Sequence, residues 1–481
     1  MSSYSKNIFS LSVGQFISLI LNFFSIVLAA RFLGVEEFGT FTSSLALILI
    51  ISKFVDFGLA PIVFREQSKL GSSYNHLNSA ISIRLIISII ILILANAAFI
   101  LFDYTINEII ISNALFFNIY ISQRMANIRE LLATPFKVIL KMHYPMTMSI
   151  FENLMLLVMI MFMPIFNLGI NYFVFSYVFA SLPSFFLMLY YLKKKTNYIF
   201  NFNLTDWQWL IKQSLPLAGF VILLVIFQQI DIILLKYYKG LYDTGIFSAS
   251  TRLTMPLNII PTTLVTTFFP SLVRNIQNDE KNKPLILIIF KFLFWISFLM
   301  ALYVSGNATN LVVTLFGSEY SESATSTIFL FWAQVFLFFN FFALDLLTAY
   351  NKQNWNFVYA IILVLSNIIF AVLLVPYYGY NGASTAKLLA SIVGVLLLIF
   401  ILIKFKIPFQ FINFRVILSF LLLTVIVFFM GQLNIVIYSA LFLFLAFIIT
   451  YYFKFFSNSE IEILIKYVPK LKVLEKYLIR N

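Results

Sequence analysis

Long runs of apolar residues, separated by short polar stretches, make up most of the chain. Each run is about 20 residues or longer, which is the length that a helix needs to cross a ~30 Å hydrocarbon core. A transmembrane β-barrel would instead show short segments of alternating hydrophobicity. The pattern predicts an all-α polytopic membrane protein with about 14 spans, at 8–33, 38–63, 77–101, 105–129, 145–166, 170–192, 206–236, 240–270, 284–305, 322–351, 355–376, 379–404, 409–430 and 433–456.

Composition excludes a soluble globular protein. The chain is 62% hydrophobic, and only 11% of its residues are charged, against about 25% in ordinary soluble domains. There is no cysteine, which excludes disulfides, thiol catalysis and cysteine-bound metals. The first apolar run, 8–33, is too long for the core of a cleavable signal peptide, so we expect an uncleaved span.

The basic residues predict the orientation of the spans. Most of the 32 lysines and arginines fall on one side of the predicted membrane, including Arg124 and Arg129 at the end of the fourth span. Cytoplasmic loops carry such an excess, so we expect both termini inside the cell. The net charge of +13 is thereby explained without nucleic-acid binding. The basic, amphipathic tail, 457–481, is expected to contact anionic lipids of the inner leaflet.

An internal repeat divides the chain. GVEEFGTFTSS, which starts at Gly34, resembles GLYDTGIFSAS, which starts at Gly240, and both follow a long span that ends near a cation. Six spans separate the two, so we predict two parallel, pseudo-symmetric six-helix lobes around a central cavity. The predicted organisation is given by five segments: an N-lobe at 1–192, a basic cytoplasmic linker at 193–205, a C-lobe at 206–404, two further spans at 405–456 and the tail.

The stretch SKFVDFGL places Lys53 and Asp56 inside the second span. Charges within a bilayer cost ~2.5–3.5 kcal/mol or more, so they usually face a cavity or a partner. Because helical side chains lean toward the helix N-terminus, Lys53 should point to the membrane centre. Arg252 occupies a similar depth on the eighth span. We predict that Lys53 and Arg252 are cations of the cavity. The alternative is that they form ion pairs that only support helix packing. Asp56 is the expected partner of Lys53, because residues three positions apart share one face of a helix.

Further polar residues lie within the spans. Arg84 and Lys387 are expected to reach the nearer membrane surface, with a cavity role as the alternative. Glu152, Asp231 and Asp345 could neutralise a cation or carry a coupling proton. Four amides suit sugar hydroxyls or, equally, hydrogen bonds between helices: Gln15, Asn22, Gln228 and Gln229.

Motifs for catalysis or metal binding are absent from the sequence. The two histidines, His76 and His143, lie beside predicted loops, and neither HExxH nor a phosphate-binding glycine loop occurs. No predicted external loop exceeds roughly 20 residues, which leaves little room for a catalytic domain. We therefore predict that the protein is not an enzyme and that it needs no metal or cofactor.

The stretches RFLGVEEFG and VDFGL, the latter followed by Arg65 and Glu66, resemble the ends of the first two spans of bacterial polysaccharide flippases of the O-antigen type. QQIDIILLKYYKGLYDTGIFSASTRL resembles their seventh and eighth spans. This family belongs to the multidrug/oligosaccharidyl-lipid/polysaccharide exporter superfamily.

The resemblance implies a function. The substrate would be an undecaprenyl-diphosphate-linked oligosaccharide, moved to the outer leaflet of the bacterial inner membrane for O-antigen (lipopolysaccharide) or capsule assembly. It also implies cavity cations on the first, second and eighth spans, for which Arg31, Lys53 and Arg252 are the candidates. Coupling to H+, Na+ or the membrane potential, and other polysaccharide assembly proteins as partners, are implied as well. A cation-coupled drug exporter of the same fold is the main alternative, and a polysaccharide polymerase or ligase is a third.

Overall fold

The computed structural model describes residues 3–70, 74–101, 104–274, 279–410, 414–430, 433–453, 455–458 and 460–462. No strand occurs within these ranges, and the all-α prediction is confirmed. Ten helices are long and apolar enough to cross a membrane, and two shorter apolar helices, Ile106–Ile121 and Val416–Met430, accompany them. Two of the ten are helical pairs merged across a kink, at Gly34 and at Gly379, so the set corresponds to the 14 predicted spans.

Contacts between residues group the chain into two compact units, Met1–Arg252 (unit 1) and Leu253–Asn481 (unit 2). The seventh span falls in unit 1 because it packs against the first, second and third spans. These units are defined by contacts, whereas the predicted lobes, 1–192 and 206–404, are defined by the repeat in the sequence. The division into lobes stays a prediction.

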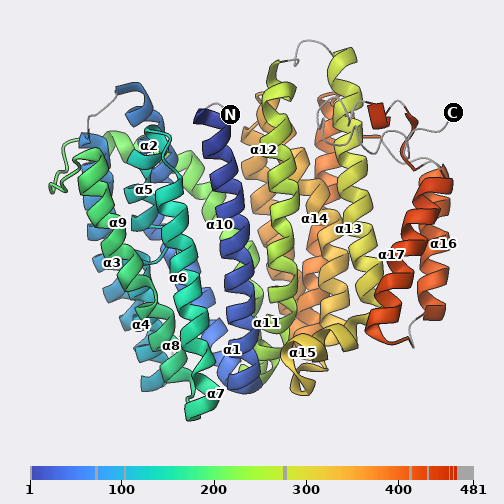
Figure 1. The fold of residues 1–481 in the computed structure, drawn as a ribbon, viewed down its shortest axis with the longest axis horizontal. Coiled ribbons are helices and arrows are strands. Elements are labelled where there is room, and N and C mark those ends of the chain that lie inside the picture. Colours follow the sequence, from blue (N-terminus) through green and yellow to red (C-terminus); the bar gives the residue numbers. More distant parts are fainter. Residues whose placement is uncertain are drawn as a thin grey trace. The chain divides into compact units, whose positions relative to one another are not determined.

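Within unit 1 the helices lie side by side as a bundle (Figure 1). The helices are α1 (Ser3–Asp56), α2 (Leu59–Leu70), α3 (Asn75–Leu101), α4 (Ile106–Ile121), α5 (Ile128–Val138), α6 (His143–Met161), α7 (Met163–Phe166), α8 (Ile170–Phe179), α9 (Ser181–Thr196), α10 (Trp207–Lys239) and the first part of α11 (Leu241–Thr254). Residues of α2, α3, α5 and α9, with Leu210 of α10, form one hydrophobic core at a single end of the bundle.

Unit 2 contains the end of α11, η1 (Met255–Asn258), α12 (Ile259–Arg274), α13 (Asp279–Phe316), η2 (Ser318–Tyr320), α14 (Ser323–Ala349), α15 (Asn354–Lys404), α16 (Phe414–Met430) and α17 (Ile435–Tyr452). The last two helices pack against α13 through a core that includes Phe420, Tyr438 and Phe442. Just after α17, Glu460 forms an ion pair with the buried Lys291 of α13, at 2.8 Å. The predicted amphipathic tail beyond residue 462 lies outside the described residues.

The predicted linker is held against unit 1. Tyr198 donates a hydrogen bond to Asn78 of α3 over 2.8 Å, and Tyr74 donates one to the carbonyl of Thr196. Burial raises the pKa of Tyr198, so the phenol stays protonated and can donate at physiological pH. Segment 197–206 therefore follows the end of the bundle rather than extending from it.

Candidate functional site

Besides the fifth span, which breaks near its end at Phe162 between α6 and α7, three spans of unit 1 are broken along their length. The second span breaks between α1 and α2, where Phe57 and Gly58 have positive φ values of 50° and 64°. The fourth breaks at Ser122–Asn127, between α4 and α5, and the sixth at Ala180, between α8 and α9. A helix break frees backbone groups, and inside a membrane these must find partners within the protein.

The first set of partners, the Asp56 cluster, consists of Lys53, Asp56, Arg84, Asn127 and Ser52. Arg84 is fully buried; it forms an ion pair with the Asp56 carboxylate and donates to the carbonyl of Asn127 over 2.5 Å. The Asn127 amide donates to the carbonyl of Ser52 over 2.8 Å. The cluster therefore joins the break in the fourth span to the break in the second.

Lys53 forms its predicted pair with Asp56, at 3.6 Å between Nζ and Oδ2. That distance exceeds a hydrogen bond, and the lysine side chain keeps 18% of its surface exposed. Arg84 differs from the expectation that it reaches the membrane surface, because Asp56 lies close enough to hold it inside the protein. Of the two cations beside Asp56, Lys53 is thus the accessible one.

The second set of partners, the Glu152 cluster, consists of Glu152, Arg124, Arg129, Ser122, Ser181 and Ser184. The Glu152 carboxylate, on α6, is fully buried and forms ion pairs with Arg129 at 2.5 Å and Arg124 at 3.2 Å. It also accepts hydrogen bonds from the hydroxyls of Ser122 and Ser181, over 2.5 and 2.9 Å. One carboxylate therefore joins the breaks in the fourth and sixth spans.

The two arginines of this cluster are incompletely satisfied. Arg124 donates to the carbonyl of Tyr177 over 2.6 Å, and its guanidinium lies 4.1 Å from the centre of that ring. Arg129 donates to the hydroxyl of Ser184 over 2.7 Å. Among the described residues, however, Arg124 Nη1 and Arg129 Nε and Nη2 are buried without a hydrogen-bond acceptor.

Positive charge exceeds negative charge where these clusters meet. Asn127 of the first cluster belongs to the same break as Arg124 of the second, so the two clusters share one segment. Together they contain four cations, Lys53, Arg84, Arg124 and Arg129, against two carboxylates, Asp56 and Glu152. An uncompensated charge in an apolar surrounding is costly, so this arrangement favours an anion.

Arg252 and Arg31, the other predicted cavity cations, have no ion pair among the described residues. Arg252 is half-buried on α11 and interacts electrostatically with Tyr177, the residue on which Arg124 rests. Arg31 is exposed, three residues before the kink at Gly34. Tyr177 is therefore a residue that both Arg124 and Arg252 interact with.

The remaining predicted residues differ in their exposure. Gln15 and Gln228 are exposed, Asn22 and Asp345 are half-buried, and Gln229, Asp231 and Lys387 are buried. Asp345 and Lys387 belong to unit 2. In the part of the chain that the structure describes, no group of three His, Cys, Asp or Glu side chains could hold a metal ion.

The two repeats meet in a reciprocal contact inside unit 1. A Cβ atom at Gly39 would overlap the backbone oxygen of Leu241, and one at Gly245 would overlap the backbone oxygen of Val35. The Ser248 hydroxyl donates to that of Thr42 over 2.8 Å, and these two residues are 206 positions apart, as are Gly39 and Gly245. Each repeat thus offers the other the same glycine face, which is the geometry of a pseudo-two-fold axis.

Sequence reasoning missed Arg124 and Arg129 as site residues because it ended the fourth span there. One signal was available. The polar stretch SQRMANIRE is followed at once by the apolar run LLATPF, 131–136, which continues the span as α5. Polar residues between two apolar helical segments are typical of a broken span as well as of a loop.

Comparisons with known proteins agree with this architecture. A family profile described as "Polysaccharide biosynthesis protein" matches residues 4–276. No curated protein matches the chain.

Solved structures share its fold. The lipid II flippase MurJ in an inward closed conformation has 17% identity and a TM-score of 0.72, over 92% of this chain and 98% of that chain. An inward-facing multidrug resistance MATE family transporter of the MOP superfamily has 14% identity and a TM-score of 0.60, over 83% and 99%. The Vibrio cholerae MATE transporter VcmN has 15% identity and a TM-score of 0.54, over 84% and 99%.

Proposed function

Since this chain belongs to the polysaccharide biosynthesis protein family, whose members are transporters rather than enzymes, we propose that it is a flippase for lipid-linked oligosaccharides. Its substrate is an undecaprenyl-diphosphate-linked repeat unit, moved from the cytoplasmic to the outer leaflet of the bacterial inner membrane. The product serves the assembly of O-antigen or capsule, together with other polysaccharide assembly proteins. Both termini are cytoplasmic.

The observation that carries this proposal is the excess of positive charge in unit 1. The Asp56 and Glu152 clusters place four cations around two carboxylates. A diphosphate brings about two negative charges, which would balance that excess. A substrate without an anionic headgroup would leave it uncompensated, at a cost of roughly 2.5–3.5 kcal/mol for each charge.

Different cations take different parts in this proposal. Arg84 and Arg129 are fully buried and committed to carboxylates, so they set the local potential. Lys53 is partly exposed and only loosely paired, and Arg252 has no carboxylate partner among the described residues, so these two contact the headgroup. Arg31, exposed near the kink at Gly34, meets the headgroup on its way out.

The reciprocal glycine contact supports alternating access. Tightly packed glycines and a hydrogen bond between two neutral hydroxyls, from Ser248 to Thr42, join the two repeats without an ion pair that opening would break. We assign this contact as the outer closure of the transporter, because it lies next to Gly34 and Gly240, in the predicted external loops.

The membrane potential favours the proposed direction. An anion that leaves a negative interior gains ~2.3 kcal/mol per charge for each 100 mV, or roughly 4–5 kcal/mol for two charges. Potential alone is therefore a sufficient driving force for the diphosphate. Asp231 and Asp345 are the residues that would carry H+ or Na+ if an ion is coupled as well.

Complementation tests the proposal. In a strain lacking the gene, Lys53→Gln and Arg252→Gln should abolish surface glycan and accumulate the lipid-linked repeat unit on the cytoplasmic side. Lys69→Gln is the matched control, because Lys69 lies on α2 with 61% of its side chain exposed. Protein levels in the membrane must be equal. Full complementation by both cavity variants would show that these cations do not hold the substrate.

A cation-coupled drug exporter is the second candidate, favoured by the shared fold with the MATE transporters. Such a protein would need a free carboxylate for a cationic drug, and in the clusters of unit 1 both Asp56 and Glu152 are bound to two cations each. Increased resistance to a panel of cationic drugs, with unchanged surface glycan, would select this function instead.

A further inference from the structure

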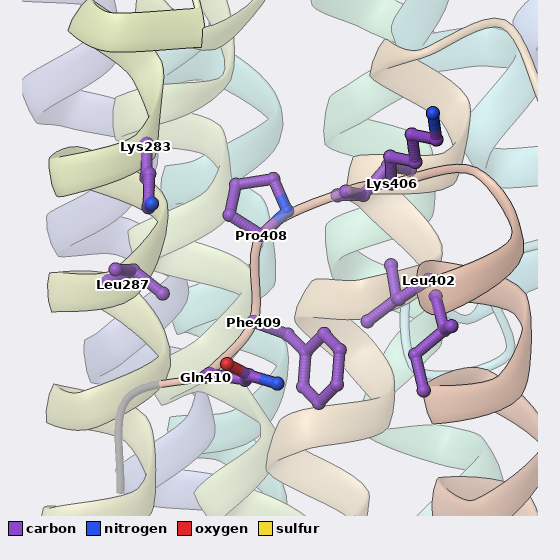
Figure 2. Close-up of a pocket in the computed structure, with 9 residues that line it drawn as sticks. Lys283, Leu287, Leu402, Lys406, Pro408, Phe409 and Gln410 are labelled. Atoms are coloured by element: carbon purple, nitrogen blue, oxygen red, sulfur yellow. The ribbon is translucent and has the colours of Figure 1, made fainter. Parts of the chain in front are cut away.

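A pocket of about 500 Å³ lies in unit 2, apart from the clusters described above. It opens between the start of α13 and the end of α15 and is closed by the segment Phe405–Gln410 that leads toward α16 (Figure 2). Its volume falls within the ~300–1,000 Å³ typical of ligand sites. Its lining residues are Lys283, Leu287, Leu402, Ile403, Lys406, Ile407, Pro408, Phe409 and Gln410.

The lining divides into a cationic rim and an apolar wall. Lys283 precedes Leu287 by one turn at the start of α13, and Lys406 follows Leu402 by one turn at the end of α15. Lys283 thus lies near the start of α13, whereas Lys406 lies two residues beyond the end of α15 at Lys404, in the segment that closes the pocket. In Figure 2 Lys283 and Lys406 lie above Leu287, Leu402 and Phe409, on opposite flanks of the segment that carries Pro408, and the side chain of Lys406 points away from Lys283. A molecule with an anionic head and an apolar body would match this gradient.

The charge of the rim is not neutralised by the protein residues that line it. The lining contains two lysines and no carboxylate. Lys404 and Lys352 add to the charge nearby: Lys404 lies 4.6 Å from the centre of the Trp355 ring, and Lys352 lies 4.9 Å from that of Phe405. Within the described ranges none of these four lysines forms an ion pair.

The backbone at Lys406 is held in an unusual conformation. Its φ is +57°, in the left-handed region where glycine or asparagine normally ends a helix. Its amide donates to the carbonyl of Ile403, and the next amide donates to the carbonyl of Leu402, so the turn is well defined. A lysine at this position sacrifices stability, yet it is one of the two cationic residues that line the pocket.

We propose that this pocket binds an anionic phospholipid of the inner leaflet, on the predicted cytoplasmic side where the basic residues lie. The phosphate would bind Lys283 and Lys406, and an acyl chain would lie along Leu287, Leu402 and Phe409. Basic pockets between spanning helices bind such headgroups, including the two-phosphate headgroup of cardiolipin. The site is separate from the substrate cations of unit 1, so the proposal does not depend on the transport function. Bound lipid would tie the segment before α16 to α13.

Native mass spectrometry of the full chain, purified in mild detergent, tests this site with three added lipids: cardiolipin, phosphatidylglycerol and phosphatidylethanolamine. Wild-type protein should retain the two anionic lipids in preference to phosphatidylethanolamine. The variant Lys283→Gln/Lys406→Gln should bind them roughly 25-fold more weakly, about fivefold for each lysine, as expected from ~1 kcal/mol per basic residue at a membrane surface.

Matched variants separate the contributions of lysine charge, protein folding and acyl-chain contact to lipid binding. Lys193→Gln/Lys195→Gln removes two exposed lysines from the end of α9 and should leave the affinity unchanged, while Lys283→Arg/Lys406→Arg should retain it. Phe409→Ser keeps both lysines. It should weaken the binding of long-chain phosphatidylglycerol but not the binding of its short-chain form. All variants should elute as wild type does in size-exclusion chromatography.

Three results would overturn the proposal. Equal retention of anionic lipid by Lys283→Gln/Lys406→Gln and by wild type would show that the lysines do not bind it. Displacement of phosphatidylglycerol by inorganic phosphate at equal concentration would identify a site for free anions. Preferential binding of a long-chain isoprenyl diphosphate would identify a substrate entrance instead of a lipid site.

Discussion

Glu152→Gln should unfold unit 1 under conditions in which the wild type stays folded. The carboxylate is fully buried and pairs with two guanidiniums, Arg129 at 2.5 Å and Arg124 at 3.2 Å. The substitution keeps the shape of the side chain but leaves both cations without their carboxylate. Breaking a buried ion pair costs about 3–5 kcal/mol, a large part of the ~5–15 kcal/mol that stabilises a typical domain.

The magnitude can be checked against a control on α5, the helix that carries Arg129. Glu130 forms a 3.5 Å ion pair with Lys137, and both side chains are about 30% exposed, at 31% and 30%. Exposed pairs contribute ~0.2–1 kcal/mol, so Glu130→Gln should change stability little. Denaturant unfolding of the purified proteins, followed by tryptophan fluorescence, measures the difference.

A double variant tests the electrostatic reasoning itself. Glu152→Gln/Arg129→Gln restores the net charge of the cluster to its wild-type value, since one cation is removed with the carboxylate. It should therefore be more stable than Glu152→Gln alone, although it carries more substitutions. Equal stability of Glu152→Gln and Glu130→Gln would refute the buried charge network as a source of stability.

Three further predictions concern the helix contacts. The chain has no native cysteine, so the two introduced thiols of Thr42→Cys/Ser248→Cys should form a disulfide where the hydroxyls now lie 2.8 Å apart. Oxidation should stop transport, and reduction should restore it. Transport by the cross-linked protein would show that this contact does not open. Gly39→Ala should impair transport, while Gly169→Ala, whose Cβ would lie 3.4 Å from its nearest neighbour, should not. Equal effects of the two substitutions would exclude close helix approach as the reason for glycine at position 39. Lys291→Gln removes the buried 2.8 Å ion pair that holds the segment after α17 and should speed proteolysis there, and an unchanged cleavage rate would show that the pair does not anchor it.

Local features of the site could be predicted from the sequence. The pair of Lys53 and Asp56 follows from their three-residue spacing, since such residues share one face of a helix. The reciprocal glycine contact follows from matching GVEEFGTF with GLYDTGIF, because repeats related by a two-fold axis present equal surfaces to each other. In both cases the information lies in neighbouring or equivalent residues.

Features that depend on distant partners could not be predicted. The direction of its helix suggested that Arg84 reaches the membrane surface, but a carboxylate 28 residues away holds it inside. Arg129 appeared to lie in a basic loop until Glu152, 23 residues later, was placed against it. A single sequence shows that a charge lies in an apolar region, whereas its partner is determined by how the helices pack.

The symmetry of the contacts and the asymmetry of the charges suggest a division of labour. The glycine contact repeats at an offset of 206 residues, but the charges do not: at that offset from Lys53 and Asp56 the second repeat has Ile259 and Thr262. A rocking motion about a pseudo-two-fold axis needs equivalent surfaces in both repeats. An anionic headgroup needs a cationic site in only one place. In the proposed mechanism, the symmetric residues therefore move the protein, and the asymmetric residues of unit 1 determine what it carries.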